Sequence, residues 1–306
     1  MNTLILGGNG FIGSHLVDKL LADGHTVRVF DKYKEYFRRP IPEVEYCFGD
    51  FGNRGLLSDA LADIDVVFHL ISTTLPKTSN DDPVFDVQSN IIESLFLMEK
   101  CVACQIKKIV FISSGGTIYG ESKILPVTED GPKNPVCSYG ITKLMIEKYL
   151  FLFGHLYGLR SAIIRPSNPY GPRQNPKSIQ GVIPVFLGKV KAGEPIEIWG
   201  DGEIVRDYIY IEDLVDGIYR AALLEASYAI FNIGSGVGYS INEILRIIRE
   251  VVGLETKVTY TEKRSLDVPK IYLDISGAKE ELSWEPVTLL ADGIKKTWDF
   301  IETLRR

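Results

Sequence analysis

A glycine-rich turn near the start of the chain, between an apolar run and a helical pattern, constrains the fold more than any other feature. Residues 4–16 read LILGGNGFIGSHL, with Gly7, Gly10 and Gly13 three residues apart. At such a junction the first glycine permits a tight turn, the second lets the backbone approach a pyrophosphate, and the third lets the helix pack closely on the strand. A helix N-terminus also attracts phosphate. The segment therefore predicts a dinucleotide site, although its G-x-x-G-x-x-G spacing differs slightly from G-x-G-x-x-G.

Apolar runs and helical patterns alternate through the first half of the chain, as in TLILGG, SHLVDKLLADG, TVRVFD, DVVFHL and KKIVFISS. This alternation predicts the α/β class, with a Rossmann-like doubly wound parallel sheet and right-handed crossovers. After about Asn168 the connections become rich in Pro and Gly. We therefore expect a dinucleotide-binding Rossmann domain over residues 1–167 and mainly a smaller mixed α/β substrate-binding domain over residues 168–306. A helical pattern and an apolar run near residues 205–235 could return to the first sheet.

The composition of the chain argues against several functions. Lys and Arg sum to 34 against 40 Asp and Glu, a formal net charge of -6, so we expect no nucleic-acid partner. No apolar stretch approaches the roughly 18 residues needed to cross a bilayer, and the start lacks a signal-peptide pattern, so we expect a cytoplasmic protein without membrane insertion. Cys101 and Cys104 form a C-x-x-C without the second pair that zinc needs. We expect buried structural thiols and no metal.

Two acidic residues stand where apolar runs end. Asp31 closes TVRVFD, where a carboxylate can accept hydrogen bonds from an adenosine ribose. This favours NAD over NADP, because a 2′-phosphate would be repelled there, although Lys32 and Lys34 weaken the inference. Asp50 closes the next run and could meet the adenine edge; alternatively it caps a helix that starts near Asn53.

The segment SYGITKLMIEKYLF is helical in pattern and carries Tyr139 and Lys143 four residues apart. That spacing brings the two side chains to one face of a helix. A phenol with a pKa of about 10 is a poor base at neutral pH, but a neighbouring ammonium and the positive nicotinamide ring of NAD would favour the phenolate. Tyr139 could then take a proton from an alcohol.

Together with these features, a series of ordered motifs spans nearly the whole chain: GGNGFIG, GDF at 49–51, HL at 69–70, SSGGTIYG, SYGITK, RPSNPYGP, GDGEIVRDYIYIEDL and RSLDVPKIYLD. The sequence thereby resembles the extended short-chain dehydrogenase/reductase superfamily and its NAD-dependent epimerase/dehydratase family. Within that family it is similar to nucleotide-sugar epimerases of the UDP-glucose 4-epimerase type. Dehydratases, decarboxylases and reductases of nucleotide sugars share most of these motifs.

The resemblance implies that Tyr139 is the catalytic base and that Lys143 tunes it and contacts the cofactor ribose. It also implies a Ser or Thr hydroxyl on the substrate, but the matching position is Gly115. We therefore expect Thr117, or alternatively Ser114, to supply that hydroxyl.

The resemblance also implies the contacts of the two ligands. The expected NAD contacts are Gly7, Gly10, Phe11, Ile12, Gly13, Asp31, Asp50, Phe51, Leu70, Asn90, Ser113, Tyr139, Lys143 and Pro166. The expected nucleotide-sugar contacts are Asn168, Val182, Phe186, Arg206, Arg264, Asp267 and Ile271. The two arginines would clamp the diphosphate, and Asp267 would meet the nucleotide ribose. Ile271 replaces a bulky aromatic residue of the family, which could leave room for a 2-N-acetyl group.

The family comparison also bears on the reaction. Nucleotide-sugar 4,6-dehydratases carry an acidic pair where this chain has Gly115, Gly116 and Thr117, so dehydration is not expected. The leading expectation is NAD-dependent epimerisation at C4 of a UDP-hexose through a 4-keto intermediate, with UDP-Glc/UDP-Gal or UDP-GlcNAc/UDP-GalNAc as substrates. The alternatives are an NAD(P)H-dependent reductase of a nucleotide-4-keto-6-deoxy sugar, for example dTDP-linked, and a non-catalytic nucleotide-sensing protein. A lipid-linked sugar diphosphate is not excluded as the substrate.

Family members commonly dimerise through two helices, one of which carries the Tyr and Lys. The apolar residues Leu144, Met145, Leu152 and Phe153 suit such a face, or equally the core. We expect a homodimer.

Overall fold

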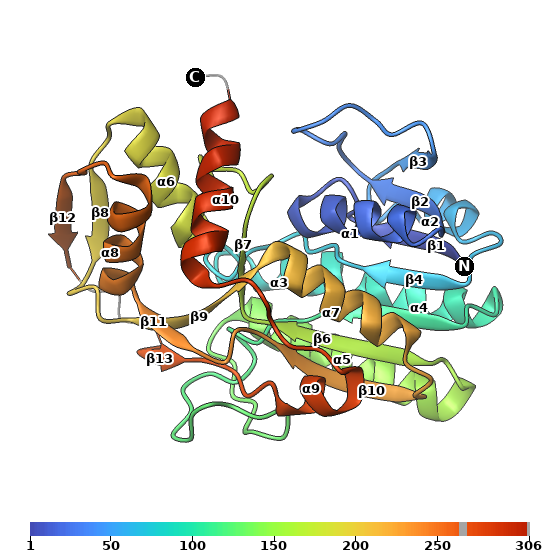
Figure 1. Ribbon diagram of the computed structural model, residues 1–306. Helices are drawn as coiled ribbons and strands as arrows, with labels where there is room; N and C mark the ends of the chain where they lie inside the picture. The colour runs from blue at the N-terminus through green and yellow to red at the C-terminus, as the bar shows by residue number, and fades with distance from the viewer. Residues whose placement is uncertain (263–267, 305–306) are drawn as a thin grey trace.

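The computed structural model describes residues 1–262 and 268–304 (Figure 1). Within these ranges, seven parallel strands form the central sheet in the order β10-β6-β5-β4-β1-β2-β3. The strands are β1 (Asn2–Leu6), β2 (Thr26–Asp31), β3 (Val44–Phe48), β4 (Val66–His69), β5 (Lys108–Ile112), β6 (Ser161–Pro166) and β10 (Tyr228–Ile233). The predicted Rossmann-like doubly wound sheet is confirmed.

Helices cover both faces of this sheet. Among the helices that pack on it are α1 (Phe11–Ala22), α2 (Arg54–Ala60), α4 (Glu93–Ala103), α5 (Ser138–Tyr157) and α7 (Ile211–Leu223). Ile5 belongs to the apolar cluster that includes α1 and α7, whereas its neighbours Leu4 and Leu6 belong to the cluster of α2, α4 and α5. Because successive side chains of a strand point to opposite faces and helices cover both faces here, three consecutive residues of β1, Leu4, Ile5 and Leu6, are apolar and buried. Two short helical segments, α3 (Pro83–Asp86) and the π-helical η1 (Val87–Ile92), lead into α4.

A second region lies beside the carboxyl edge of the sheet (Figure 1). Its elements are β7 (Asn168–Tyr170), α6 (Val182–Ala192), β8 (Ile196–Trp199), β9 (Val205–Tyr210), β11 (Gly238–Ser240), α8 (Ile241–Val252), β12 (Val258–Thr261), β13 (Lys270–Ile271), α9 (Ser276–Leu282) and α10 (Leu290–Thr303). Between β9 and β11 the chain returns to the central sheet, where β10 pairs in parallel with β6. The division into domains at residue 168 stays a prediction.

The register of the central strands decides where a site can form. Leu6 pairs with His69, His69 with Phe111, and Ile112 with Ile164, so β1, β4, β5 and β6 end at one edge. The loops that follow these strands therefore meet at that edge, where ligands bind in open α/β sheets.

Cys101 is buried in α4, but Cys104, at the end of that helix, is exposed. The expectation of buried thiols is therefore wrong for Cys104. Among the described residues there is no cluster of three or more His, Cys, Asp or Glu that could hold a metal ion. None of the described helices is both long enough and apolar enough to cross a bilayer.

Candidate active site

A cavity of about 1100 Å³ opens at the carboxyl edge of the sheet, between the sheet and the second region. Among the residues that the structure describes, three cationic side chains line it, from Lys77, Lys143 and Arg206. None of the described residues that line it is acidic, although the whole chain carries a net charge of -6. A cavity with this charge pattern favours an anionic ligand.

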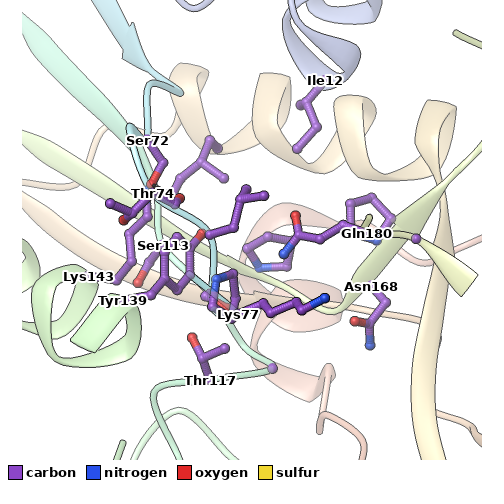
Figure 2. A pocket seen from close by; sticks show the side chains of 18 of the residues that line it. Ile12, Ser72, Thr74, Lys77, Ser113, Thr117, Tyr139, Lys143, Asn168 and Gln180 are labelled. Carbon is purple, nitrogen blue, oxygen red and sulfur yellow. Dashed lines mark hydrogen bonds between the residues drawn. The ribbon is translucent and has the colours of Figure 1, made fainter. Parts of the chain in front are cut away.

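Many of the predicted site residues meet in this cavity. The predicted residues that line it are Gly7, Gly10, Phe11, Ile12, Gly13, Leu70, Ser113, Thr117, Tyr139, Lys143, Pro166, Asn168 and Arg206. Most of them come from the ends of β1, β4, β5 and β6 or the loops that follow, and from the first two turns of α1 and α5; Asn168 and Arg206 come from β7 and β9. Figure 2 shows several of them, together with Ser72, Thr74, Lys77 and Gln180.

The glycine-rich turn forms one end of the cavity through its backbone. Gly7 has a φ of +86°, a conformation that side chains disfavour, and Gly10 is the N-cap of α1. A Cβ atom on Gly13 would lie 2.2 Å from the carbonyl oxygen of Gly7 and 2.6 Å from the Cα of Gly8. The helix can therefore approach the turn this closely only with glycine at position 13.

The two predicted acidic contacts lie near this turn but do not line the cavity. The carboxylate of Asp31 accepts hydrogen bonds from the amides of Asn9 and Tyr33, each at 3.0 Å. Burial raises the pKa of Asp31, and these hydrogen bonds oppose the rise. Asp50 accepts a hydrogen bond from the amide of Gly52 and pairs with Lys32 at 3.0 Å, and both contacts lower its pKa.

The alternative role for Asp50, as the cap of the following helix, is wrong. The side chain of Asn53 caps α2 by accepting a hydrogen bond from the amide of Leu56 at 3.2 Å. Asp50 instead stabilises the turn before that cap.

Tyr139 and Lys143 lie side by side on α5, as their spacing predicts (Figure 2). The Nζ of Lys143 lies 5.6 Å from the centre of the Tyr139 ring and donates a hydrogen bond to the carbonyl of Ile112 at 2.9 Å. Burial lowers the pKa of Lys143 to about 8, although the carboxylates of Asp86 and Glu147 raise it.

The ionisation of Tyr139 differs from the expectation based on spacing. Burial raises the pKa of Tyr139 well above its ordinary value; Cys137 and Asp86 raise it further, and a hydrogen bond with Ser72 opposes them. The neighbouring ammonium alone therefore does not favour the phenolate in this structure, because desolvation has the larger effect. Further positive charge, such as that of an oxidised nicotinamide ring, is needed beside the phenol.

The departure from the family pattern at Gly115 has a packing reason. A Cβ atom there would lie 2.6 Å from Cδ1 of Leu273 and 3.0 Å from the carbonyl oxygens of Arg165 and Pro166. A Ser or Thr at this position would require the surrounding chain to move.

Thr117 and Ser114 both line the cavity and remain the two candidates for the missing hydroxyl. The Oγ1 of Thr117 is buried and has no hydrogen-bond partner among the described residues. Such an atom is costly to leave unpaired, which favours Thr117 as the group that meets a ligand.

The predicted substrate contacts fall into three groups. Asn168 and Arg206 line the cavity; Nδ2 of Asn168 donates to the carbonyl of Asp207 at 2.8 Å, and Nη1 of Arg206 donates to the carbonyl of Val205 at 2.9 Å. Arg264 and Asp267 lie outside the described residues.

The other three predicted substrate contacts do not reach the cavity. Val182 packs against the large apolar cluster, and Phe186, 7% exposed, belongs to it. Ile271 is 2% exposed and packs with Ile118 and Leu273 in a separate cluster. Their contacts with a substrate stay predictions.

Two of the predicted cofactor contacts also lie away from the cavity. Phe51 is buried with its ring 5.2 Å from that of His69. Asn90 is buried and donates hydrogen bonds to Thr73 and Asp86.

Sequence reasoning missed the loop after β4, which supplies Ser72, Thr74, Lys77 and Asn80 to the cavity wall. In Figure 2, Lys77 reaches across the cavity between Tyr139 and Asn168. The loop directly follows β4, a central strand of the sheet. This place in the sequence could have indicated the loop as part of the site, because parallel strands end at the ligand-binding edge.

Comparison with known proteins decides the family. Residues 3–234 match the family model described as the NAD dependent epimerase/dehydratase family. The chain belongs to this family. The resemblance drawn from its motifs is therefore confirmed.

Individual relatives match over almost the whole chain. The UDP-glucose 4-epimerase of Mycolicibacterium smegmatis is 37% identical over 98% of both chains. A dTDP-4-dehydro-6-deoxyglucose reductase of Escherichia coli is 34% identical over 96% of this chain and 95% of that protein.

Two solved structures are similar in fold as well as in sequence. The UDP-glucose 4-epimerase of Thermotoga maritima, solved with UDP-glucose, has a TM-score of 0.94 at 37% identity, over 99% of both chains. The UDP-glucose 4-epimerase of Thermus thermophilus, solved with NAD, has a TM-score of 0.92 at 31% identity, over 99% of both chains.

Proposed function

We propose that this member of the family is an NAD-dependent nucleotide-sugar epimerase that inverts C4 of a UDP-hexose. The observation that carries the proposal is the cavity itself, in which the Tyr139 and Lys143 pair lies across from the glycine-rich turn and no described acidic side chain intrudes. The relatives named UDP-glucose 4-epimerase support the same reaction.

The residues at the turn fit NAD. The amides at the start of α1 point to where a pyrophosphate would bind, and Gly7 and Gly13 leave no side chain in its way. Asp31, at the end of β2, would accept hydrogen bonds from the adenosine ribose, and Lys143 from the other end of the cavity would donate to the nicotinamide ribose. When bound, NAD takes a hydride from C4 of the sugar and returns it.

Tyr139 acts as the base that removes the proton of the 4-hydroxyl group. Burial raises its pKa, so the phenolate forms only when positive charge gathers beside it. The pKa of Lys143, about 8, keeps this ammonium mostly protonated at neutral pH. The same phenol returns the proton when the 4-keto group is reduced on its other face.

The remaining cavity residues hold the sugar nucleotide. The unpaired hydroxyl of Thr117 would orient the 4-hydroxyl group, and Arg206 and Asn168 would hold the diphosphate. The cavity of about 1100 Å³ would hold NAD and the sugar nucleotide together, and the keto sugar would turn between its two faces there.

The charge of the lining also argues against water elimination. Dehydration at C5 and C6 needs a general acid and base, and the described lining offers no carboxylate near Gly116 and Thr117. Oxidation and reduction at one carbon need the Tyr139 and Lys143 pair and a bound NAD as hydride acceptor and donor, but no such carboxylate.

A second candidate, reduction of a nucleotide-linked 4-keto-6-deoxy sugar, has the support of one specific observation. The Escherichia coli relative of that name is 34% identical to this chain. Such a reductase would use the same pair but would exchange its cofactor in every turnover.

We also propose a cytoplasmic homodimer that pairs through α5, the helix of Tyr139 and Lys143, and a second helix. On α5, Met145 is 39% exposed and Leu152 is 40% exposed, whereas Leu144 is half-buried and Phe153 is buried. Ile141, on the same helix, is 51% exposed. An exposed apolar helix face of this kind suits a self-complementary interface.

The test starts with protein purified without added cofactor, from which any bound nicotinamide is released and identified. The protein is then incubated with UDP-Glc and UDP-GlcNAc, and the products are separated by chromatography. Copurified NAD and a mixture of C4 epimers would support the proposal and rank the two hexose pairs. Stoichiometric oxidation of NADH or NADPH on a 4-keto sugar nucleotide, without any epimer, would establish the reductase instead.

A further inference from the structure

A fully buried carboxylate lies beside the catalytic helix and has no part in the proposed mechanism. Asp86, the last residue of α3, is 0% exposed. Its Oδ1 accepts hydrogen bonds from Oγ1 of Thr74 at 2.5 Å and Nδ2 of Asn90 at 3.0 Å. Its Oδ2 accepts them from Oγ of Ser138 at 2.6 Å and Oγ1 of Thr142 at 2.8 Å. A buried charge is costly without such donors, so four side chains are committed to this one group.

The two carboxylate oxygens connect different parts of the molecule. Oδ1 holds Thr74, which lies in the loop that lines the cavity after β4. Oδ2 holds Ser138 and Thr142, which lie in the first two turns of α5, on either side of Tyr139 and next to Lys143. Asp86 therefore joins a wall of the cavity to the helix that carries the catalytic pair.

The same loop also supplies the cap of α5. Cys137 stands at the N-cap position, but its side chain makes no capping hydrogen bond. Instead, Oδ1 of Asn80 accepts from the amide of Ser138 at 2.8 Å, and Oγ of Ser79 accepts from the amide of Tyr139 at 3.0 Å. Helix ends need such acceptors for their free amides, so the start of α5 depends on the position of this loop.

We propose that Asp86 is a positioning residue that fixes the cavity-lining loop 72–80 against the first turns of α5 and thereby sets the place and the charge of the Tyr139 and Lys143 pair. The inference deepens the proposed function and rests on the role of that pair.

The charge of Asp86 shifts the pKa values of neighbouring groups, which packing contacts alone would not do. The titratable groups on which it acts are Cys137, Tyr139 and Lys143, all in or beside the first turns of α5. Its own helix is capped by Asp82, and Glu147 is the other carboxylate that acts on Lys143. Asp86 raises the pKa of both Tyr139 and Lys143, since a negative charge disfavours the phenolate and favours the ammonium.

The first experiment compares Asp86→Asn with Asp82→Asn, a matched change in the same helix at an exposed carboxylate that caps α3. Without the charge of Asp86, the pKa of Tyr139 and the pKa of Lys143 both fall. The rising and falling limbs of the kcat/KM profile should then both move to lower pH, by about one pH unit. We also expect kcat to fall about 10²-fold through misplacement of the pair. Asp82→Asn should leave the profile and kcat unchanged.

A second pair of variants separates position from charge. Thr74→Val removes the link to the loop but keeps the carboxylate, and Thr128→Val is its matched control at an exposed threonine outside this loop. Thr74→Val should lower kcat and raise KM without moving either limb of the pH profile. Thr128→Val should change neither.

Hydrogen exchange of the protein with NAD bound provides a measurement that needs no turnover. Asp86→Asn and Thr74→Val should each speed amide exchange in residues 72–80 and in the first turn of α5, relative to their controls. If Asp86→Asn does not fold, Ser138→Ala removes another link without changing any charge and should show the same faster exchange. Unchanged exchange together with unmoved pH limbs would overturn the proposal. Wild-type protein that forms no epimer would contradict the proposed function alone, because the exchange result would still stand.

Discussion

The two ends of the cavity are built in different ways. At the cofactor end the backbone forms the surface, and Gly7, Gly10 and Gly13 lie within one turn and the start of one helix. At the catalytic end side chains form the surface, and Tyr139 is held through Ser79, from a loop 60 residues earlier in the chain.

This difference decides what each end can tolerate. At the cofactor end Gly13 has no space for a Cβ atom and Gly7 has a φ that side chains disfavour, so this end fails by collision or backbone strain when a side chain is introduced there. The catalytic end depends on charges and hydroxyl groups, so it fails by the loss of one atom while the fold stays intact. Substitutions at the two ends should therefore separate cofactor binding from chemistry.

The largest effect should come from Tyr139→Phe at the catalytic end. The variant keeps the ring and its packing but loses the phenol oxygen, so proton transfer from the 4-hydroxyl group has no base. We expect epimerisation to fall about 10³-fold or more. NAD should copurify in the wild-type amount, which mass analysis of the released cofactor will check. A variant that keeps most of its activity would contradict the mechanism.

Gly13→Ala should have the opposite pattern, with damage confined to the cofactor end. Its Cβ atom would lie 2.2 Å from the carbonyl oxygen of Gly7, so α1 must shift from the turn. We expect NAD binding to weaken about 10²-fold and the free energy of unfolding to fall by about 3 kcal/mol. Gly55→Ala is the control, because its Cβ atom would have its nearest contact at 3.6 Å, an ordinary van der Waals distance. Calorimetric titration with NAD and thermal unfolding measure both effects.

The difference between the two ends of the cavity also explains which features could be predicted from the sequence. The sheet, the glycine turn and the Tyr139 and Lys143 pair were predictable because each depends on a local pattern of spacing and apolar periodicity. The charge state of Tyr139 was not, since burial by distant segments outweighs the neighbouring ammonium.

Residues whose surroundings come from elsewhere in the chain were harder to place. The sequence did not indicate that Leu273 closes the space beside Gly115, nor that Ile271 packs with Leu273 in an apolar cluster and is not itself part of the cavity lining. It also gave no reason to single out Lys77 or Asp86, whose positions depend on how one loop folds against α5. Contacts of this kind depend on the tertiary fold and have no spacing rule.

Thr117→Val tests one hydroxyl group at the catalytic end, because it removes that group at nearly constant volume. The Oγ1 of Thr117 has no partner among the described residues, so its loss should not lower thermal stability. We expect kcat for epimerisation to fall about 10-fold with NAD binding unchanged. Ser114→Ala tests the competing hydroxyl in the same loop. A larger loss of kcat in Ser114→Ala than in Thr117→Val would assign the role to Ser114.

Lys77→Met should have the smallest effect, and it tests whether the loop after β4 serves the sugar nucleotide rather than the cofactor. Lys77 lines the cavity, and its Nζ lies 5.7 Å from the centre of the Trp199 ring in the second region. An ammonium there can pair with an anionic group of the substrate, and its loss should raise KM for the UDP-hexose about 5-fold with kcat unchanged. Lys77→Arg should restore most of the binding, and Lys123→Met, the same change at an exposed lysine of another loop, should alter nothing. Weaker NAD binding with an unchanged KM for the sugar nucleotide would instead assign Lys77 to the cofactor end.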